Sequence, residues 1–322
     1  MSLSSYDTNF FLDPLNPTWM GDLVYLLKVA ENNQLRLDPT NTTYLRAGHD
    51  GDESIAIGYG YDLLQNSSAE IISDLASVNV VLTPQQITAI QNLSGTYSAT
   101  NIPSDISSIS LPSEQAAEDL LIRAIEKRLY IGTQLGAGTI TNPENGTFLH
   151  RMQSLGINMP DSREKAVLMS MWYQGGNNYF GTLASPSNMV NALIAGDRAE
   201  AWFEIRYGSS KNGKDGPGVV KRRYFEADYF GLYENGTTPD NITENEAVDI
   251  LSMYTRHRDT IVDYEKRFGE TPAWSENGRQ HAPKNYVEIA SLTNEYGYSF
   301  SLTLEDNLNI ARSKLIDEYV VN

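Results

Sequence analysis

Glu31 is the first residue whose type and position could do chemistry. It lies four residues after Leu27, on the apolar face of a helix predicted over residues 19–33 and near the carboxyl end of that helix. Partial burial and the negative end of the helix dipole both disfavour an ionised carboxylate. The position therefore suits a general acid that keeps its proton at neutral pH.

A second carboxylate, Asp62, ends a segment in which apolar residues alternate with small or polar ones. This period of two predicts a strand over residues 54–62. Asp62 would share a strand face with Gly58 and Gly60, where a ligand could approach the backbone closely. A helix-end glutamate facing a strand-borne aspartate across a cleft is the arrangement that glycoside hydrolysis by paired carboxylates needs. The other face of the strand would carry Ile55, Ile57, Tyr59 and Tyr61.

The elements that must position these residues are mostly helices, because apolar residues recur at helical spacing after capping residues. With the short strand, this predicts a mainly helical α+β fold with a small antiparallel sheet. The composition turns polar after residue 235, which predicts a boundary there. Helix starts are expected at Thr83, Ser113, Asp161-Ser162 and Asp197, and further helices over residues 219–233, 244–268 and 304–319.

Composition excludes several classes of function. The chain has 322 residues, enough for about two domains, and 41 acidic against 24 basic residues give it a net charge of −17. That charge argues against binding nucleic acid or an anionic lipid surface. The chain contains no cysteine and its four histidines lack metal-ligand spacing, so no metal or cofactor is expected. The first residues are not expected to act as a signal peptide, and no apolar run is long enough to predict a membrane span.

The segment from Glu31 through Ile57-Gly58-Tyr59-Gly60 resembles the catalytic lobe of phage-type lysozymes. The fuller sequence Gly58-Tyr59-Gly60-Tyr61-Asp62-Leu63 is most similar to the pesticin-like branch of that superfamily. Three later segments resemble its helical lobe in the same order: residues 163–176, 191–203 and 220–228. The matching segments are separate, and from first to last they span about residues 20–233.

The resemblance implies a two-lobed lysozyme-like domain over residues 1–235, with a small lobe near 34–75 and a helical lobe near 113–233. It implies hydrolysis of the β-1,4 bond between N-acetylmuramic acid and N-acetylglucosamine in peptidoglycan, with inversion. Glu31 would protonate the leaving oxygen, and an aspartate would activate water. Residues 236–322 would be an accessory segment. The residues expected to contact the glycan strand are Ser54, Tyr59 and Gln174.

The chain departs from the family pattern at Ala56, which stands where a threonine usually helps to hold the attacking water. Ser54 could supply a hydroxyl instead. In the classical phage enzymes the catalytic aspartate lies six residues before the threonine position, and Asp50 is the corresponding residue here. In the pesticin-like branch it lies six residues after that position, and Asp62 is the corresponding residue. We favour Asp62, because a strand would fix its direction, whereas Asp50 is expected in a Gly/Asp loop.

Because no leader is expected, such an enzyme would reach the periplasm or cell wall as a phage endolysin or as a toxin carried by a secretion machine. Its partners would then include that machine or an immunity protein. Two other functions stay open: a lysozyme-like protein that binds glycan or serves structurally in a phage or secretion particle without turnover, and a hydrolase of another glycan such as chitin.

Overall fold

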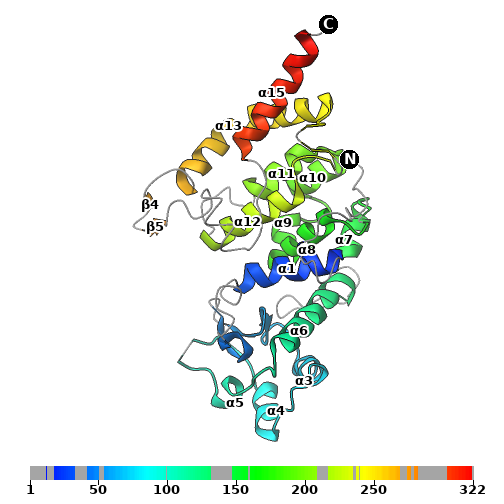
Figure 1. Ribbon diagram of the computed structural model, residues 1–322. Coiled ribbons are helices and arrows are strands. Elements are labelled where there is room, and N and C mark those ends of the chain that lie inside the picture. The colour runs from blue at the N-terminus through cyan, green and yellow to red at the C-terminus, as the bar shows by residue number, and fades with distance from the viewer. Residues whose placement is uncertain are drawn as a thin grey trace. The chain divides into compact units, whose positions relative to one another are not determined.

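A computed structural model gives a mainly helical chain with a small antiparallel sheet, as the sequence predicts (Figure 1). The chain divides into two compact units: unit 1 comprises residues 1–26 and 152–322, and unit 2 comprises residues 27–151. The division falls within the first helix, α1 (Trp19–Asn32). The structure describes residues 12, 18–32, 42–50, 54–98, 100–131, 147–158, 160–208, 217–234, 237–238, 240–268, 274–276, 279–281 and 303–320.

Unit 2 contains a three-stranded antiparallel sheet in which β2 is the central strand. The single strand predicted over residues 54–62 is wrong, because the chain reverses at residues 58–60 and forms a hairpin. Ile55, Ile57, Tyr59 and Tyr61 are nevertheless all buried, as the alternation predicts. The strands are β1 (Gly48–Asp50), β2 (Ser54–Ile57) and β3 (Tyr61–Asp62).

Three helices of unit 2, α3, α4 and α6, begin at side chains that cap their free N–H groups. Thr83 and Gln86 form the predicted capping box at the start of α4, and the Ser113 hydroxyl accepts a hydrogen bond from the N–H of Ala116 in α6. Leu75 and Leu120, on α3 and α6, are fully buried. The elements are η1 (Thr43–Leu45), α3 (Ser68–Ser77), α4 (Pro84–Gln91), α5 (Ser104–Ser107), α6 (Glu114–Glu126) and the π-turn η2 (Lys127–Ile131).

Unit 1 is built around α8, whose side chains are buried over most of its length. Its Ser162 cap and the Asp197 cap of α11 both accept a backbone N–H, as the sequence predicts. On α12, Arg222 and Arg223 are buried beside Glu226. Runs of consecutive basic residues usually face solvent, but the two arginines of this Lys-Arg-Arg run are buried. The elements are α7 (Phe148–Ser154), which crosses the boundary between the units, α8 (Arg163–Gly175), α9 (Asn177–Phe180), α10 (Asn188–Ala195), α11 (Arg198–Arg206) and α12 (Pro217–Phe230).

The C-terminal segment belongs to unit 1, so the two units do not divide at residue 235. The helix α13 (Glu244–Phe268) packs against both α11 and α15 (Leu304–Val320), and it buries Ile250 and Met253 (Figure 1). A short hairpin of β4 (Trp274–Glu276) and β5 (Arg279–His281) lies between α13 and α15 in the chain. Among the described helices, none is long and apolar enough to cross a membrane.

Candidate active site

The carboxylate of Glu31 lies against the turn of the β2–β3 hairpin. Gly58 and Gly60 have φ angles of +66° and +80°, which side-chain-bearing residues rarely adopt, so the Gly-Tyr-Gly sequence makes this three-residue turn. A Cβ atom at Gly60 would lie 3.4 Å from Oε2 of Glu31. The last turn of α1 therefore places the carboxylate of Glu31 beside the hairpin turn.

Glu31 occupies the last turn of α1, as predicted, but its side chain is exposed rather than partly buried. The expected burial was wrong because α1 ends at Asn32, one residue later. An exposed carboxylate is accessible to a substrate.

A cluster of polar side chains ties α1 to α6 one turn before Glu31. Lys28 Nζ donates to Glu114 Oε1 at 3.0 Å and also binds Glu118. Tyr59, in the hairpin turn, is buried, and its hydroxyl donates to the same Glu114 oxygen at 3.1 Å. The hydrogen bond from Lys28 holds the pKa of Glu114 below its usual value. The carboxylate of Glu114 thus links the end of α1, the hairpin turn and α6.

The same cluster affects the prediction that Tyr59 contacts the glycan strand. Its side chain is 2% exposed, and the Lys28 ammonium lies 5.4 Å from its ring centroid. In the structure Tyr59 therefore fixes the hairpin from inside unit 2, and its contact with substrate stays a prediction. The sequence analysis missed Lys28 and Glu114, because the two residues are 86 positions apart and no local pattern joins them.

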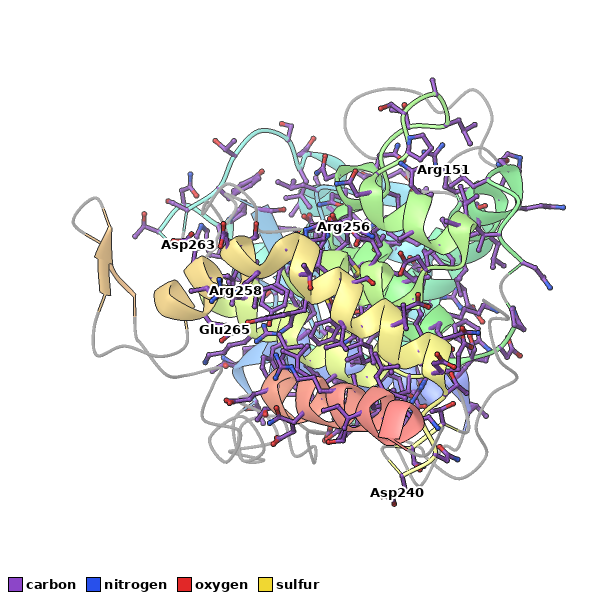
Figure 2. The ribbon with its side chains drawn as sticks, turned by 90° about the horizontal axis from the view of Figure 1, so that it is seen from above. Arg151, Asp240, Arg256, Arg258, Asp263 and Glu265 are labelled. Carbon is purple, nitrogen blue, oxygen red and sulfur yellow. The ribbon has the colours of Figure 1, made fainter. Side chains whose placement is uncertain are left out.

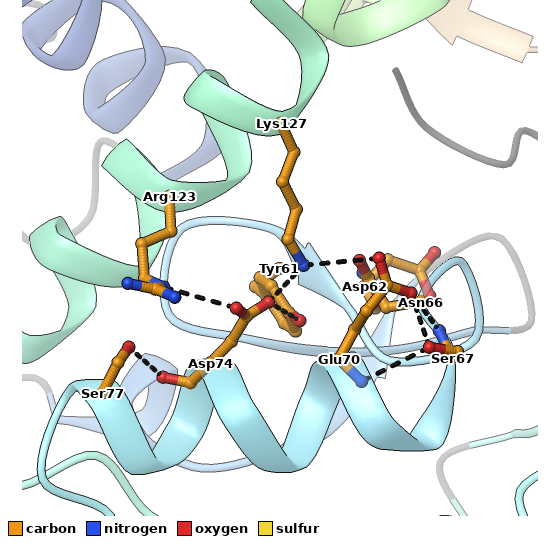
Figure 3. Close-up of polar contacts among 9 residues, drawn as sticks. All are labelled: Tyr61, Asp62, Asn66, Ser67, Glu70, Asp74, Ser77, Arg123 and Lys127. Atoms are coloured by element: carbon orange, nitrogen blue, oxygen red, sulfur yellow. Dashed lines mark hydrogen bonds and ion pairs between the residues drawn. The ribbon is translucent and has the colours of Figure 1, made fainter. Parts of the chain in front are cut away.

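Asp62 anchors the turn that follows β3. Its Oδ1 accepts the Ser54 hydroxyl at 2.6 Å and the backbone N–H of Leu64 at 2.7 Å, and Oδ2 accepts Gln65 Nε2 at 3.0 Å (Figure 3 draws Asp62 and the start of α3). The Ser54 hydroxyl is therefore bound to Asp62, and its role in holding a water molecule stays a prediction. Asp62 lies on β3, opposite Ala56, and not on one strand with Gly58 and Gly60 as expected.

A buried aspartate on α3 holds the strand that carries Asp62. Asp74 accepts the Tyr61 hydroxyl at 2.6 Å, and it pairs with Arg123 at 3.3 Å and with Lys127 (Figure 3). Burial and the hydrogen bond to Asp74 raise the pKa of Tyr61 far above its usual value, so the phenol stays neutral. Asp62 is thereby positioned by the adjacent Tyr61, which Asp74 holds, and by its own hydrogen bonds to the turn after β3.

Asp50 is the last residue of β1, not part of a loop as expected, and its Cα is paired with that of Ser54. The pairing of β1 with β2 holds the backbone of Asp50 in place, which the sequence did not reveal. Ala56 is paired with Gly48 on one side and with Asp62 on the other. The central strand thus carries the serine opposite one candidate aspartate and the alanine opposite the other.

Gln174 is the one candidate residue that belongs to unit 1; the other five belong to unit 2. Its Oε1 accepts Arg223 Nη2 at 2.6 Å, and the Arg223 guanidinium lies 4.3 Å from the ring centroid of Tyr179. Arg223 is fully buried, so this interaction helps to hold α8 and α12 together. The side chain of Gln174 is half-buried and its role toward substrate stays a prediction.

Within the described residues, no group of three or more His, Asp or Glu side chains is arranged to hold a metal ion. Comparisons with protein-family models, curated proteins and solved structures give no match.

Proposed function

We propose that the chain is a peptidoglycan hydrolase that cleaves the β-1,4 bond between N-acetylmuramic acid and N-acetylglucosamine. The observation that carries the proposal is the contact between Glu31 and the hairpin turn: an accessible carboxylate at a helix end lies against Gly60, two residues before Asp62. The sequence resemblance to pesticin-like lysozymes assigns the acid and the aspartate to these two positions.

In this proposal the two carboxylates have separate roles. Glu31 donates its proton to the glycosidic oxygen as the bond breaks, and an aspartate orients and activates a water molecule on the opposite face of the sugar. Oδ1 of Asp62 is occupied by the Ser54 hydroxyl and two backbone N–H groups, whereas Oδ2 has one contact among the described residues, to Gln65. Oδ2 is therefore the atom assigned to water.

The decisive experiment replaces Glu31 by glutamine, which keeps the shape of the side chain and removes the acid. Glu31→Gln should lower the release of reducing ends from peptidoglycan by at least about a hundredfold while the thermal unfolding midpoint stays close to wild type. Glu126→Gln on α6, also an exposed glutamate, is the matched control and should keep full activity. A folded Glu31→Gln protein that lyses walls normally would remove Glu31 from the mechanism.

A second function, glycan binding without turnover, is favoured by two specific observations. Asp62 already accepts four side-chain or backbone donors, as a purely structural turn anchor would. Ala56, opposite Asp62, brings no hydroxyl to the position where water would be held. This function predicts that wild-type protein sediments with peptidoglycan but releases no reducing ends, and that Glu31→Gln binds equally well.

The target and its compartment follow from the same proposal. A muramidase of this kind acts on glycan strands in the periplasm or cell wall, after delivery as an endolysin or as a secreted antibacterial toxin. Mass spectrometry of the released fragments separates muramidase activity from cleavage of chitin or of another glycan.

A further inference from the structure

The turn that follows β3 holds Asp62 through one oxygen of its carboxylate and through its backbone. Oδ1 accepts the Ser54 hydroxyl at 2.6 Å, the N–H of Leu64 at 2.7 Å and the N–H of Gln65 at 3.2 Å. The backbone carbonyl of Asp62 accepts Asn66 Nδ2 at 2.7 Å (Figure 3 draws both residues). A carboxylate oxygen has two lone pairs, so Oδ1 has no room for a further donor.

Oδ2 of the same carboxylate is less crowded. Among the described residues its one donor is Gln65 Nε2, at 3.0 Å. The nitrogen of the amide must face Oδ2, because a carboxylate accepts hydrogen bonds and cannot donate them. Oδ2 therefore keeps a second acceptor site. That site lies beside a side chain that is exposed, since Gln65 is exposed and Asp62 is half-buried.

The amide oxygen of Gln65 is a further acceptor next to this site. Oε1 shares a carbon atom with Nε2, and in the part of the chain that the structure describes it has no hydrogen-bond partner. A water molecule that donates one hydrogen to Oδ2 of Asp62 can therefore donate the other to Oε1. Both hydrogens would then be fixed, and the lone pairs of the water oxygen would stay available to attack an electrophilic carbon.

Two neighbouring side chains are less suited to hold this water. Ser54 is 8% exposed, and the hydrogen of its hydroxyl is already donated to Oδ1. Ala56, whose Cα is paired with that of Asp62, carries only a methyl group. Gln65 differs from both, because its side chain is exposed and is already bound to Oδ2.

We propose that Gln65 is a further catalytic residue of the hydrolysis: its Nε2 fixes Oδ2 of Asp62, and its Oε1 accepts a hydrogen bond from the attacking water. This inference rests on the proposed function, because it needs a reaction in which water attacks. The water oxygen bonds to the anomeric carbon as one of its protons passes to Oδ2. The bond from that carbon to the glycosidic oxygen breaks, and the leaving oxygen takes the proton of Glu31. The amide of Gln65 neither gives nor takes a proton.

The test measures the release of reducing ends from soluble peptidoglycan fragments by the full chain. Gln65→Met keeps the length of the side chain and removes both polar atoms, so it should lower kcat by about tenfold or more and leave KM within about twofold. Its thermal unfolding midpoint should stay close to wild type, because the side chain is exposed. The matched control is Gln91→Met, at an exposed glutamine on α4 of the same unit. A second control in unit 1 is Arg258→Ala, at an exposed position on α13 (Figure 2), and both controls should keep the wild-type kcat and KM.

Gln65→Glu supplies a measurement that a merely structural role would not change. When protonated, the new carboxyl group can donate to Oδ2 and accept from water as the amide does. When ionised, it repels the carboxylate of Asp62. The kcat of Gln65→Glu relative to wild type should therefore rise as the pH falls from 7 to 5, whereas the same ratio for Gln65→Met should stay flat.

The outcomes separate this inference from the proposed function. If the wild type releases reducing ends and Gln65→Met keeps its kcat, or changes KM alone, the inference is wrong and the proposed function stands. The same holds if the pH dependence of Gln65→Glu follows that of wild type, and this measurement decides alone if Gln65→Met fails to fold. If the wild type releases no reducing ends, both the proposed function and the inference fail.

Discussion

Gly60 is the residue of the hairpin turn that lies next to the proposed acid. Its φ angle of +80° disfavours any other residue, and a Cβ there would make van der Waals contact with the carboxylate of Glu31, 3.4 Å from Oε2. Gly95 has a similar φ of +87° but open space around its missing Cβ. The two glycines therefore compare backbone strain next to Glu31 with the same strain at a position that has nothing within 4 Å of the added Cβ.

We predict that Gly60→Ala and Gly95→Ala each destabilise the fold by about 1–2 kcal/mol, because an alanine is held in left-handed backbone. Only Gly60→Ala should also lower lytic activity, by about tenfold or more, since relief of the backbone strain would shift the turn that lies beside Glu31. Chemical denaturation and a peptidoglycan assay on the two proteins measure both effects. Equal activity in the two variants would mean that the contact with Gly60 has no catalytic importance.

The two candidate aspartates can be compared in the same assay. Asp62→Asn should reduce activity far more than Asp50→Asn, because Oδ2 of Asp62 is the atom assigned to water. Asp62→Asn also places an amide beside Gln65 Nε2, so a fall in stability is expected and is measured separately by thermal unfolding. If Asp50→Asn is inactive while Asp62→Asn keeps most of its activity, the end of β1 carries the catalytic aspartate.

At the scale of elements, Lys28 joins the last turns of α1 to the start of α6. The pKa of Glu114 is lowered chiefly by the hydrogen bond from Lys28, so Glu114 stabilises the folded state above its unfolded pKa. That contribution is lost as the pH falls through the lowered folded-state value. Because the Glu114 side chain is 57% exposed, solvent screens the pair and the contribution is below about 1 kcal/mol.

Lys28→Met should therefore lower the unfolding midpoint slightly at pH 7 and flatten its decline below about pH 4.5, where the wild-type pair is progressively lost. Thermal unfolding from pH 7 to pH 3 measures the two profiles. High salt should reduce the difference between them, since the charges are partly exposed. Parallel profiles for the two proteins would show that the Lys28 pair contributes nothing to acid stability.

Local signals predicted most of the elements but not the hairpin. Capping residues and helical spacing gave the start of α4 and both ends of α13, because these depend on neighbours within four residues. The burial alternation of residues 54–62 continues through a three-residue turn, so a hairpin and a single strand look alike in that pattern. Gly58 and Gly60 were the available signal, since both occupy left-handed backbone.

Pairs that are distant in the sequence could not be predicted at all. The buried Arg206 forms an ion pair with Glu265, which lies 59 residues away in the sequence. The two residues meet because α13 packs on α11. The same holds for the Lys28 and Glu114 pair beside the proposed acid. The sequence thus suggested the carboxylates of the candidate site, whereas the contacts that position them required the fold.

For the whole molecule, the division into units follows packing rather than composition. The polar stretch after residue 235 looks like a boundary, yet α13 buries Ile250 against the rest of unit 1. Unit 1 also takes residues from both ends of the chain, which no local signal indicates. All four tryptophans, Trp19, Trp172, Trp202 and Trp274, fall in unit 1, so tryptophan fluorescence reports that unit alone.

The last prediction uses this distribution of tryptophans. Ile250→Ala on α13 and Leu75→Ala on α3 each empty a fully buried position, at a cost of about 2–5 kcal/mol. Ile250→Ala should lower the unfolding midpoint seen by tryptophan fluorescence, because α13 is part of unit 1. Leu75→Ala should lower the midpoint seen by far-ultraviolet circular dichroism more than the fluorescence midpoint. If both variants shift the fluorescence midpoint equally, the units unfold as one cooperative body, and residues 236–322 stabilise the proposed catalytic residues as well as unit 1.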